Sequence, residues 1–205
     1  MINQLYAITD TLLLPGEKLF LGVEAALKGG CQLVQYRDKS TDTRRRTQDA
    51  KRLLVLCNQY GAKLIINDDL ALALEINAHG LHLGQGDGDA KTARLRLGAD
   101  TILGVTCHDS LELAEAAIGD GATYIAFGRF FSSNTKPDAR PAPLGLISEA
   151  KQKFPQIDIA AIGGIDLSNA GDVIASGANM LAVCQSLFAA DNIETRAQAF
   201  TQLLK

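Results

Sequence analysis

The chain has 205 residues, of which 47% are hydrophobic and 21% are charged, with 19 glycines and 5 prolines. This length and composition predict a globular protein with a full hydrophobic core, and one domain over residues 1–205 is the simplest organisation. A net charge of −3 weighs against a broad basic surface, and therefore against nucleic-acid binding.

Targeting, membrane and disulfide signals are missing from the sequence. The N-terminus has no basic segment followed by a long apolar one, and no apolar stretch approaches the roughly 20 residues that a membrane-spanning helix needs. The four cysteines (Cys31, Cys57, Cys107 and Cys184) show neither a Cys-x-x-Cys spacing nor a zinc-ligand spacing. We therefore expect a cytoplasmic protein with reduced thiols and no membrane contact.

Short apolar runs typical of buried strands recur along the whole chain. They cover residues 5–9, 32–36, 63–67, 80–83, 101–105, 123–128, 157–162 and 180–183. Segments with helical spacing of apolar residues lie between them, at 17–30, 44–61, 109–121, 167–177 and 194–205, and several of these end at a glycine. Strand and helix therefore alternate, which predicts parallel βαβ units.

Two architectures accommodate this alternation: an open doubly wound sheet and a closed (β/α)8 TIM barrel. The open sheet predicts about five or six strands and a glycine-rich phosphate turn after the first strand. Here the first strand is followed by ITDTLLLPGEK, which contains no such turn, and the apolar runs number eight. The α/β fold class with a single compact TIM barrel is therefore our prediction.

The stretch VQYRDK ends the second strand with long polar side chains at alternate positions. Leu33, Gln35 and Arg37 share one face of the strand, and Lys39 continues it if the chain stays extended. At the C-terminal end of a barrel strand this face opens onto the mouth, where the two cations and the amide would suit a diphosphate. From this segment alone, ion pairing with Asp38 and other rim carboxylates is equally consistent.

The next two strand ends carry carboxylates and other polar groups. These are Asn67, Asp68 and Asp69 after the third strand, and His82, Gln85, Asp87 and Asp89 on and after the fourth. Carboxylates from adjacent strand ends can meet around Mg²⁺, which usually takes one or two of them together with substrate phosphate oxygens. We expect Asp69 instead to cap a helix that begins at Leu70.

The later strand ends and one charge run have two readings each. Asp109 or Ser110 is expected to cap the helix after the fifth strand. The loop after the sixth strand is either a mobile lid with an anion site or a plain surface excursion. Gly163 and Gly164 suit either a barrel phosphate site or a simple turn. The triple arginine at 44–46 is predicted to form a solvated helix face.

Taken in order, QYRDK, NDD, HLGQGD, GVTCH, SNTKPD, AIGGI and the eighth strand resemble the thiamine phosphate synthase family over nearly the whole chain. The resemblance implies a transferase of the alkyl and aryl class, active in thiamine biosynthesis. It would join an aminopyrimidine diphosphate to a thiazole phosphate, and it would use Mg²⁺. The implied partners are small-molecule substrates, and a homo-oligomer is compatible with the sequence.

Site residues carry over from the resemblance position by position. The pyrimidine diphosphate would be held by Gln35, Arg37, Lys39, Asn67 and Lys136, with Thr106 beside the ring, and the wider substrate-binding set includes Tyr36 and Asp38. The thiazole phosphate would be held by Ser133, Asn134, Thr135, Gly164, Cys184 and Gln185. Asp68 and Asp87 would bind Mg²⁺, while the charges of Arg37, Lys39 and Lys136 would act in catalysis.

The sequence departs from the family pattern at two places. Cys184-Gln185 stands where many members have Val-Ser, which removes a hydroxyl from the phosphate site, and Ser133 stands where threonine is common. Two other functions compete: a thiazole tautomerase-like isomerase paralogue and a non-catalytic phosphate-binding barrel. Neither needs both the Gln35-x-Arg37-x-Lys39 pattern and the Asp68/Asp87 pair, so the synthase is favoured.

Overall fold

A computed structural model of the chain describes residues 3–131 and 142–205. The strands are β1 (Gln4–Ile8), β2 (Leu33–Tyr36), β3 (Lys63–Asn67), β4 (Gly80–Leu83), β5 (Ile102–His108), β6 (Tyr124–Phe127), β7 (Asp158–Ile162) and β8 (Met180–Val183). Each strand pairs in parallel with the next one, and β8 pairs with β1. The predicted TIM barrel is therefore confirmed.

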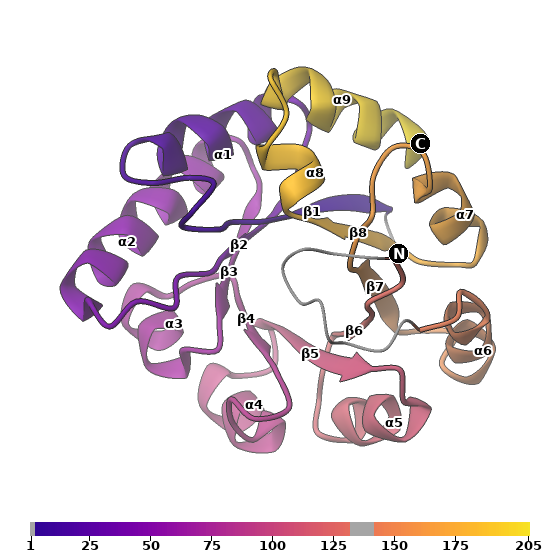
Figure 1. Cartoon of the computed structure of the whole chain (residues 1–205). Coiled ribbons are helices and arrows are strands. Elements are labelled where there is room, and N and C mark those ends of the chain that lie inside the picture. Colours follow the sequence, from indigo (N-terminus) through magenta and orange to yellow (C-terminus); the bar gives the residue numbers. More distant parts are fainter. Residues whose placement is uncertain (1–2, 132–141) are drawn as a thin grey trace.

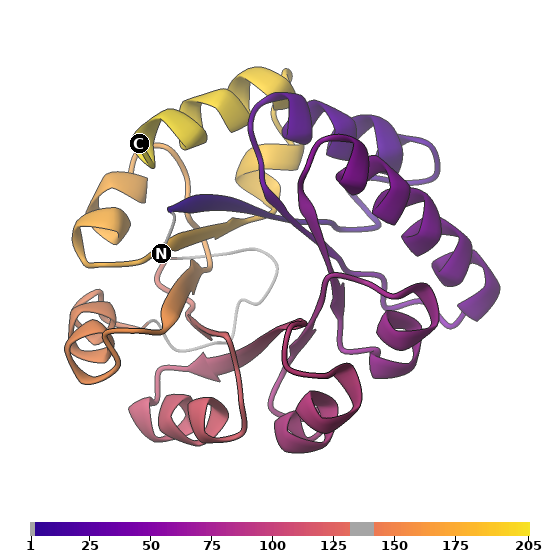
Figure 2. The same ribbon diagram turned by 180° about the vertical axis from the view of Figure 1, so that it is seen from behind.

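Helices surround this barrel on the outside (Figures 1 and 2). They are α1 (Lys18–Lys28), α2 (Thr43–Gln59), α3 (Leu70–Ile76), α4 (Ala90–Leu97), α5 (Leu111–Gly119), α6 (Gly145–Lys153), α7 (Ala170–Ala175), α8 (Gln185–Phe188) and α9 (Ile193–Leu203). The first helix packs against both α2 and the last helix, α9, so the helical ring closes around the barrel. Among the described residues, no helix has the length and apolar character needed to cross a membrane.

Most predicted boundaries agree with the structure within a few residues, and the fifth strand is the exception. The apolar run was expected to end at residue 105, but β5 continues to His108, with a register shift against β6 between Thr106 and His108. Thr106 and His108 are polar, so the apolar pattern stops before the backbone pairing does. The expected caps are present, because Asp69 accepts from the Leu72 amide and Ser110 from the Leu113 amide.

Side chains alternate between two hydrophobic layers along each strand. In β1, Leu5 and Ala7 pack against the helices, whereas Tyr6 and Ile8 lie inside the barrel. In β8 the interior side chains are Met180 and Ala182. This period of two carries the interior face of each strand to the mouth at the C-terminal ends of the strands.

Gly104 makes room inside the barrel for the ring of Tyr124. A Cβ atom at position 104 would lie 2.0 Å from Cζ of Tyr124, which is fully buried. We predict that Gly104→Ala lowers the free energy of unfolding by about 1–3 kcal/mol, because the ring must leave its position. Denaturant unfolding measures the change. Gly171→Ala, a helical position with open space around it, is the control, and equal stability of all three proteins would contradict the prediction.

Candidate active site

The end of β2 sends the predicted cations toward the mouth. Gln35 is buried inside the barrel, and the backbone N–H of Arg37 donates to Oγ1 of Thr9 at 2.9 Å. The Arg37 side chain is 27% exposed and lies 3.9 Å from an Asp10 oxygen, which is a loose contact. Lys39 pairs with Asp68 at the end of β3. The structure thus brings the β2 and β3 strand ends together.

Asp68 and Asp87 form the predicted carboxylate pair. Their side chains interact directly, and Asn67 Nδ2 donates to Asp68 Oδ2 at 2.6 Å. Burial raises the pKa of Asp68, but the hydrogen bond and charge of Lys39 outweigh it, so the net pKa lies below its ordinary value. Asp68 is therefore ionised at neutral pH, as a metal ligand must be.

Local geometry positions each of the two carboxylates. Asp68 adopts a left-handed conformation with φ of 64°, which is uncommon for a residue other than glycine. The Asp87 carboxylate folds back over Gly84, where a Cβ atom would lie within 2.4 Å of its Oδ2. Sequence reasoning did not include Gly84. Its signal was the glycine in HLGQGD, immediately after β4.

A cavity of about 340 Å³ opens between the loops that follow β2 and β3. It is lined by Asp38, Lys39, Ser40, Arg46, Asn67, Asp68, Asp69 and Leu70. Of the polar groups predicted from the sequence, Lys39 of the VQYRDK face and the whole NDD segment contribute to its walls. Its volume lies at the small end of the range for ligand pockets.

Tyr36 and Asp38 lie on the other side of the strand end, although Asp38 also lines the cavity. They alternate with Gln35 and Arg37, so their side chains lie on the outer face of the strand end. The Tyr36 hydroxyl donates to Asp38 Oδ2 at 3.2 Å, and the Asp38 side chain is only 1% exposed. Asp38 therefore forms part of the back wall of the loop, and its carboxylate is occupied by protein donors.

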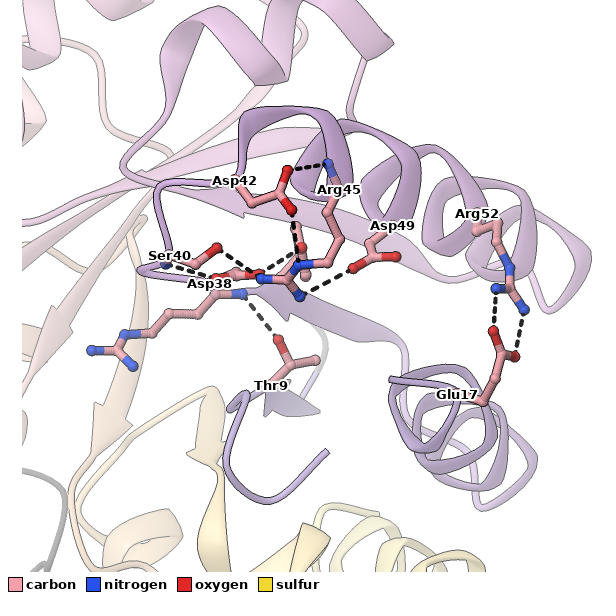
Figure 3. Close-up of polar contacts among 10 residues, drawn as sticks. Thr9, Glu17, Asp38, Ser40, Asp42, Arg45, Asp49 and Arg52 are labelled. Carbon is pink, nitrogen blue, oxygen red and sulfur yellow. Dashed lines mark hydrogen bonds and ion pairs between the residues drawn. The ribbon is translucent and has the colours of Figure 1, made fainter. Parts of the chain in front are cut away.

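Arg45 forms hydrogen bonds and ion pairs that hold the loop after β2 in place (Figure 3). Its guanidinium donates to Asp38 Oδ2 and to Ser40 Oγ, both at 2.7 Å, and it lies 3.6 Å from Asp49. The triple arginine was predicted to be a solvated face, and for Arg45 and Arg46 this is wrong, since Arg46 pairs with Asp69 at 2.7 Å. Carboxylates on neighbouring loops bind both arginines because α2 begins directly behind the β2 loop.

A hydrogen-bonded chain that the sequence did not reveal crosses the barrel interior. Gln35 Nε2 donates to the Tyr6 hydroxyl at 2.6 Å, and the hydroxyls of Tyr6 and Tyr124 are 2.7 Å apart. His82 bonds to the Tyr124 hydroxyl through Nδ1 and to Thr106 Oγ1 through Nε2, each at 2.8 Å. Gln35 and Thr106, both predicted to contact substrate, are thereby connected through three residues.

The strand ends of β7 and β8 supply the other predicted phosphate site. Gly163 and Gly164 have φ of 99° and 67°, a conformation that favours glycine. Cys184 precedes α8 and Gln185 is its first residue, while the Ser186 hydroxyl donates to the Ile165 carbonyl at 2.6 Å. The remaining predicted contacts, Ser133, Asn134, Thr135 and Lys136, lie outside the described residues.

Comparison with known proteins relates this barrel to enzymes that synthesise thiamine phosphate. Residues 5–187 match the family described as thiamine monophosphate synthase. A thiamine-phosphate synthase of Saccharophagus degradans is 54% identical over 202 residues, which cover 98% of this chain and 93% of that protein.

Solved structures agree in fold with these sequence relatives. Thiamine phosphate pyrophosphorylase from Pyrococcus furiosus superposes with a TM-score of 0.89 at 30% identity, covering 98% of this chain and 95% of that one. The Bacteroides thetaiotaomicron protein of the same name has a TM-score of 0.70 at 20% identity over 98% and 96% of the two chains, a likeness of fold. The chain belongs to the thiamine monophosphate synthase family.

Proposed function

We propose that this family member joins 4-amino-2-methyl-5-hydroxymethylpyrimidine diphosphate to 4-methyl-5-(2-hydroxyethyl)thiazole phosphate by a Mg²⁺-assisted dissociative substitution. The products are thiamine phosphate and diphosphate. The observation that carries this proposal is the meeting of Lys39 with the interacting Asp68 and Asp87 carboxylates beside an open cavity. A site that combines carboxylates with a cation suits a metal-bound diphosphate better than a single phosphate.

The donor set fits Mg²⁺. Two carboxylates from neighbouring loops match the one or two that Mg²⁺ usually takes in phosphate-binding sites, and the exposed Asp87 leaves room for water and substrate oxygens. Asp68 and Asp87 would hold the ion. When bound, Mg²⁺ offsets the negative charge of the diphosphate and of its leaving oxygen.

The cations of the β2 loop act on the bond that breaks. As the pyrimidine methylene carbon separates from the diphosphate oxygen, the electron pair moves to that oxygen, and the ring amino group releases electrons to the carbon. Arg37 and Lys39 then face a growing negative charge, so their attraction is stronger in the transition state than in the ground state. The thiazole nitrogen attacks the carbon and completes the exchange, which depends on the two substrates being held together.

The protein supplies no covalent nucleophile in this proposal. Burial raises the pKa of the thiols of Cys107 and Cys184 to about 12, and that of Cys31 to about 11. Such thiols stay protonated at neutral pH and are poor nucleophiles. All four cysteines are free, which fits the cytoplasm as the site of the reaction.

The thiazole phosphate would be held mainly by backbone N–H groups after β7 and β8. We therefore predict that Gln185→Ser is nearly silent, whereas Gly164→Val raises KM for thiazole phosphate at least about tenfold. A branched residue at φ of 67° strains the turn and blocks a close approach of the backbone. Steady-state kinetics with a melting curve for each variant separates binding from folding. A large loss in Gln185→Ser with a silent Gly164→Val would instead indicate side-chain binding.

The competing function, a thiazole tautomerase-like isomerase, would carry out a different reaction. A thiazole tautomerase would rearrange its thiazole substrate without a diphosphate and without Mg²⁺. The test is to supply each substrate alone and then both together, with Mg²⁺, and to identify products by mass. Thiamine phosphate formed only from the mixture supports the synthase. Rearranged thiazole without thiamine phosphate would support the isomerase, and no turnover would leave a binding function.

A further inference from the structure

The interior chain of hydrogen bonds joins two predicted substrate contacts through three residues that have no other assigned role. Tyr6 and Tyr124 are each 1% exposed, and their rings meet edge to face with centroids 5.8 Å apart. His82 stacks on the Tyr124 ring at 5.6 Å. Gly104 leaves the space that the Tyr124 ring fills, so the arrangement is built into the barrel packing.

All hydrogen bonds in this interior network are donated in the same direction, from Gln35 toward Thr106. Gln35 Nε2 is a donor, so the Tyr6 oxygen accepts from it. The Tyr6 hydroxyl in turn donates its hydrogen bond to the Tyr124 oxygen. If Tyr124 donated to Tyr6 instead, the buried Tyr6 hydrogen would have no acceptor in the chain, which native interiors rarely allow. Burial also raises the pKa of both phenols, which keeps both hydroxyls protonated and able to donate.

The direction continues through His82 to Thr106. Tyr124 must donate to His82 Nδ1, so Nδ1 carries no hydrogen and the neutral ring carries it on Nε2. That hydrogen is donated to Thr106 Oγ1. The Thr106 oxygen thereby accepts from His82, and the hydrogen of its own hydroxyl remains to donate at the mouth.

The two ends of the chain consequently present opposite polarity. Gln35 turns its Nε2 inward to Tyr6, which directs the carbonyl Oε1 away from the chain as an acceptor. Thr106, half-buried near the end of β5, offers a hydrogen. An aminopyrimidine presents an amino donor beside a ring-nitrogen acceptor, and this pattern complements the pair. An oxopyrimidine presents an acceptor where the amino group would be.

We infer that Tyr6, Tyr124 and His82 are positioning residues that fix the polarity of Gln35 and Thr106, and that they thereby select an aminopyrimidine diphosphate over its 4-oxo analogue. The inference rests on the proposed function, because it takes Gln35 and Thr106 as the ring contacts. Selection has a physical basis, since a site that hydrogen-bonds a substrate group rejects an analogue that leaves its polar atoms unpaired.

The first test reads the hydrogen positions in the wild-type protein and needs no variant. NMR of the ¹⁵N-labelled histidine side chains is tractable because the chain has three histidines. We expect His82 to be neutral, with hydrogen on Nε2 and none on Nδ1. His79, whose Nδ1 accepts from the Leu64 amide at 3.0 Å, provides an internal reference for the same tautomer. Hydrogen on Nδ1 of His82 would overturn the inference.

The second test measures selection by binding, without thiazole phosphate. Dissociation constants are determined for the aminopyrimidine diphosphate, its 4-oxo analogue and inorganic diphosphate, all with Mg²⁺. We expect the wild type to prefer the amino compound by about 100-fold. Tyr124→Phe frees the Tyr6 hydroxyl to donate to Gln35 Oε1, so the amide turns over and the preference falls by at least about tenfold. Tyr6→Phe releases the amide and is expected to do the same.

Two controls separate positioning from a general structural effect. Inorganic diphosphate has no ring, so its affinity is expected to stay within about twofold in every variant. Tyr60→Phe removes a phenol hydroxyl that bonds to Glu24 at 2.9 Å on the outer surface, and it is expected to keep the full preference.

The outcomes distinguish this inference from the proposed function. If the Tyr6→Phe and Tyr124→Phe proteins keep the 100-fold preference, the inference is wrong and the synthase assignment stands. If the wild-type protein fails to make thiamine phosphate from the two substrates, the proposed function fails first. A loss of preference together with a loss of diphosphate affinity would mean that the tyrosines support the whole mouth, which also contradicts the inference.

Discussion

Asp68→Asn and Asp87→Asn are each expected to lower the rate of thiamine phosphate formation by about 100-fold or more while leaving the fold intact. A neutral amide is a much poorer Mg²⁺ ligand than a carboxylate. Asp68 is also the residue that Lys39 pairs with, so its loss releases a cation as well as a ligand. Turnover measured against Mg²⁺ concentration shows whether the apparent metal affinity falls.

Asp89→Asn is the matched control for the metal assignment. Asp89 lies two residues after Asp87 but caps α4 by accepting from the Thr92 amide at 2.7 Å. Its replacement is expected to change stability slightly, because asparagine caps helices about as well as aspartate, and to leave the Mg²⁺ dependence unchanged. Near-normal turnover of both Asp68→Asn and Asp87→Asn at limiting Mg²⁺ would rule out the metal site.

Arg37→Ala is expected to lower kcat/KM for the pyrimidine diphosphate by about 100- to 1,000-fold, with both kcat and KM affected. The guanidinium lies at the mouth, and within residues 3–131 and 142–205 its one ion pair is a loose contact to Asp10, so its charge is available to a ligand. Because the diphosphate becomes more negative as it leaves, the lost charge matters more in the transition state. Initial rates with the pyrimidine substrate varied give both constants.

Arg44→Ala serves as the comparison for Arg37→Ala. Arg44 is an exposed residue at the start of α2, the helix that follows the β2 loop. The Arg44→Ala substitution removes the same charge from the same region of the surface, and we expect little change in either kcat or KM. If Arg37→Ala altered only the affinity for thiazole phosphate, the assignment of the VQYRDK face to the diphosphate would be wrong.

Local patterns in the sequence were sufficient for the barrel and for much of the mouth. Eight apolar runs alternating with helices predicted the closed sheet, and the period of two placed Gln35 and Arg37 on one face. The same period places Tyr36 and Asp38 on the other face, which the structure confirms. Their inclusion among the substrate contacts came from the family resemblance and stays a prediction.

The interior chain could not be read from local patterns because its members are distant in sequence. Tyr6 and Tyr124 are separated by 118 positions, and each lies in an apolar run where tyrosine counts as one more hydrophobic residue. One signal was present: a buried tyrosine hydroxyl needs a partner, and Tyr6, His82 and Tyr124 all fall on interior positions. Arg45 was missed for a different reason: its partner Asp38 is near in sequence but precedes the helix, so helical spacing does not pair the two residues.

The most direct test of the central claim is the stoichiometry of products as Mg²⁺ is varied. With both substrates present, we expect equal amounts of thiamine phosphate and diphosphate at every Mg²⁺ concentration, a rate that rises to saturation with Mg²⁺, and a rate close to zero in excess chelator. Full turnover in the presence of chelator, or product formed without an equal release of diphosphate, would contradict the Mg²⁺-assisted synthase reaction.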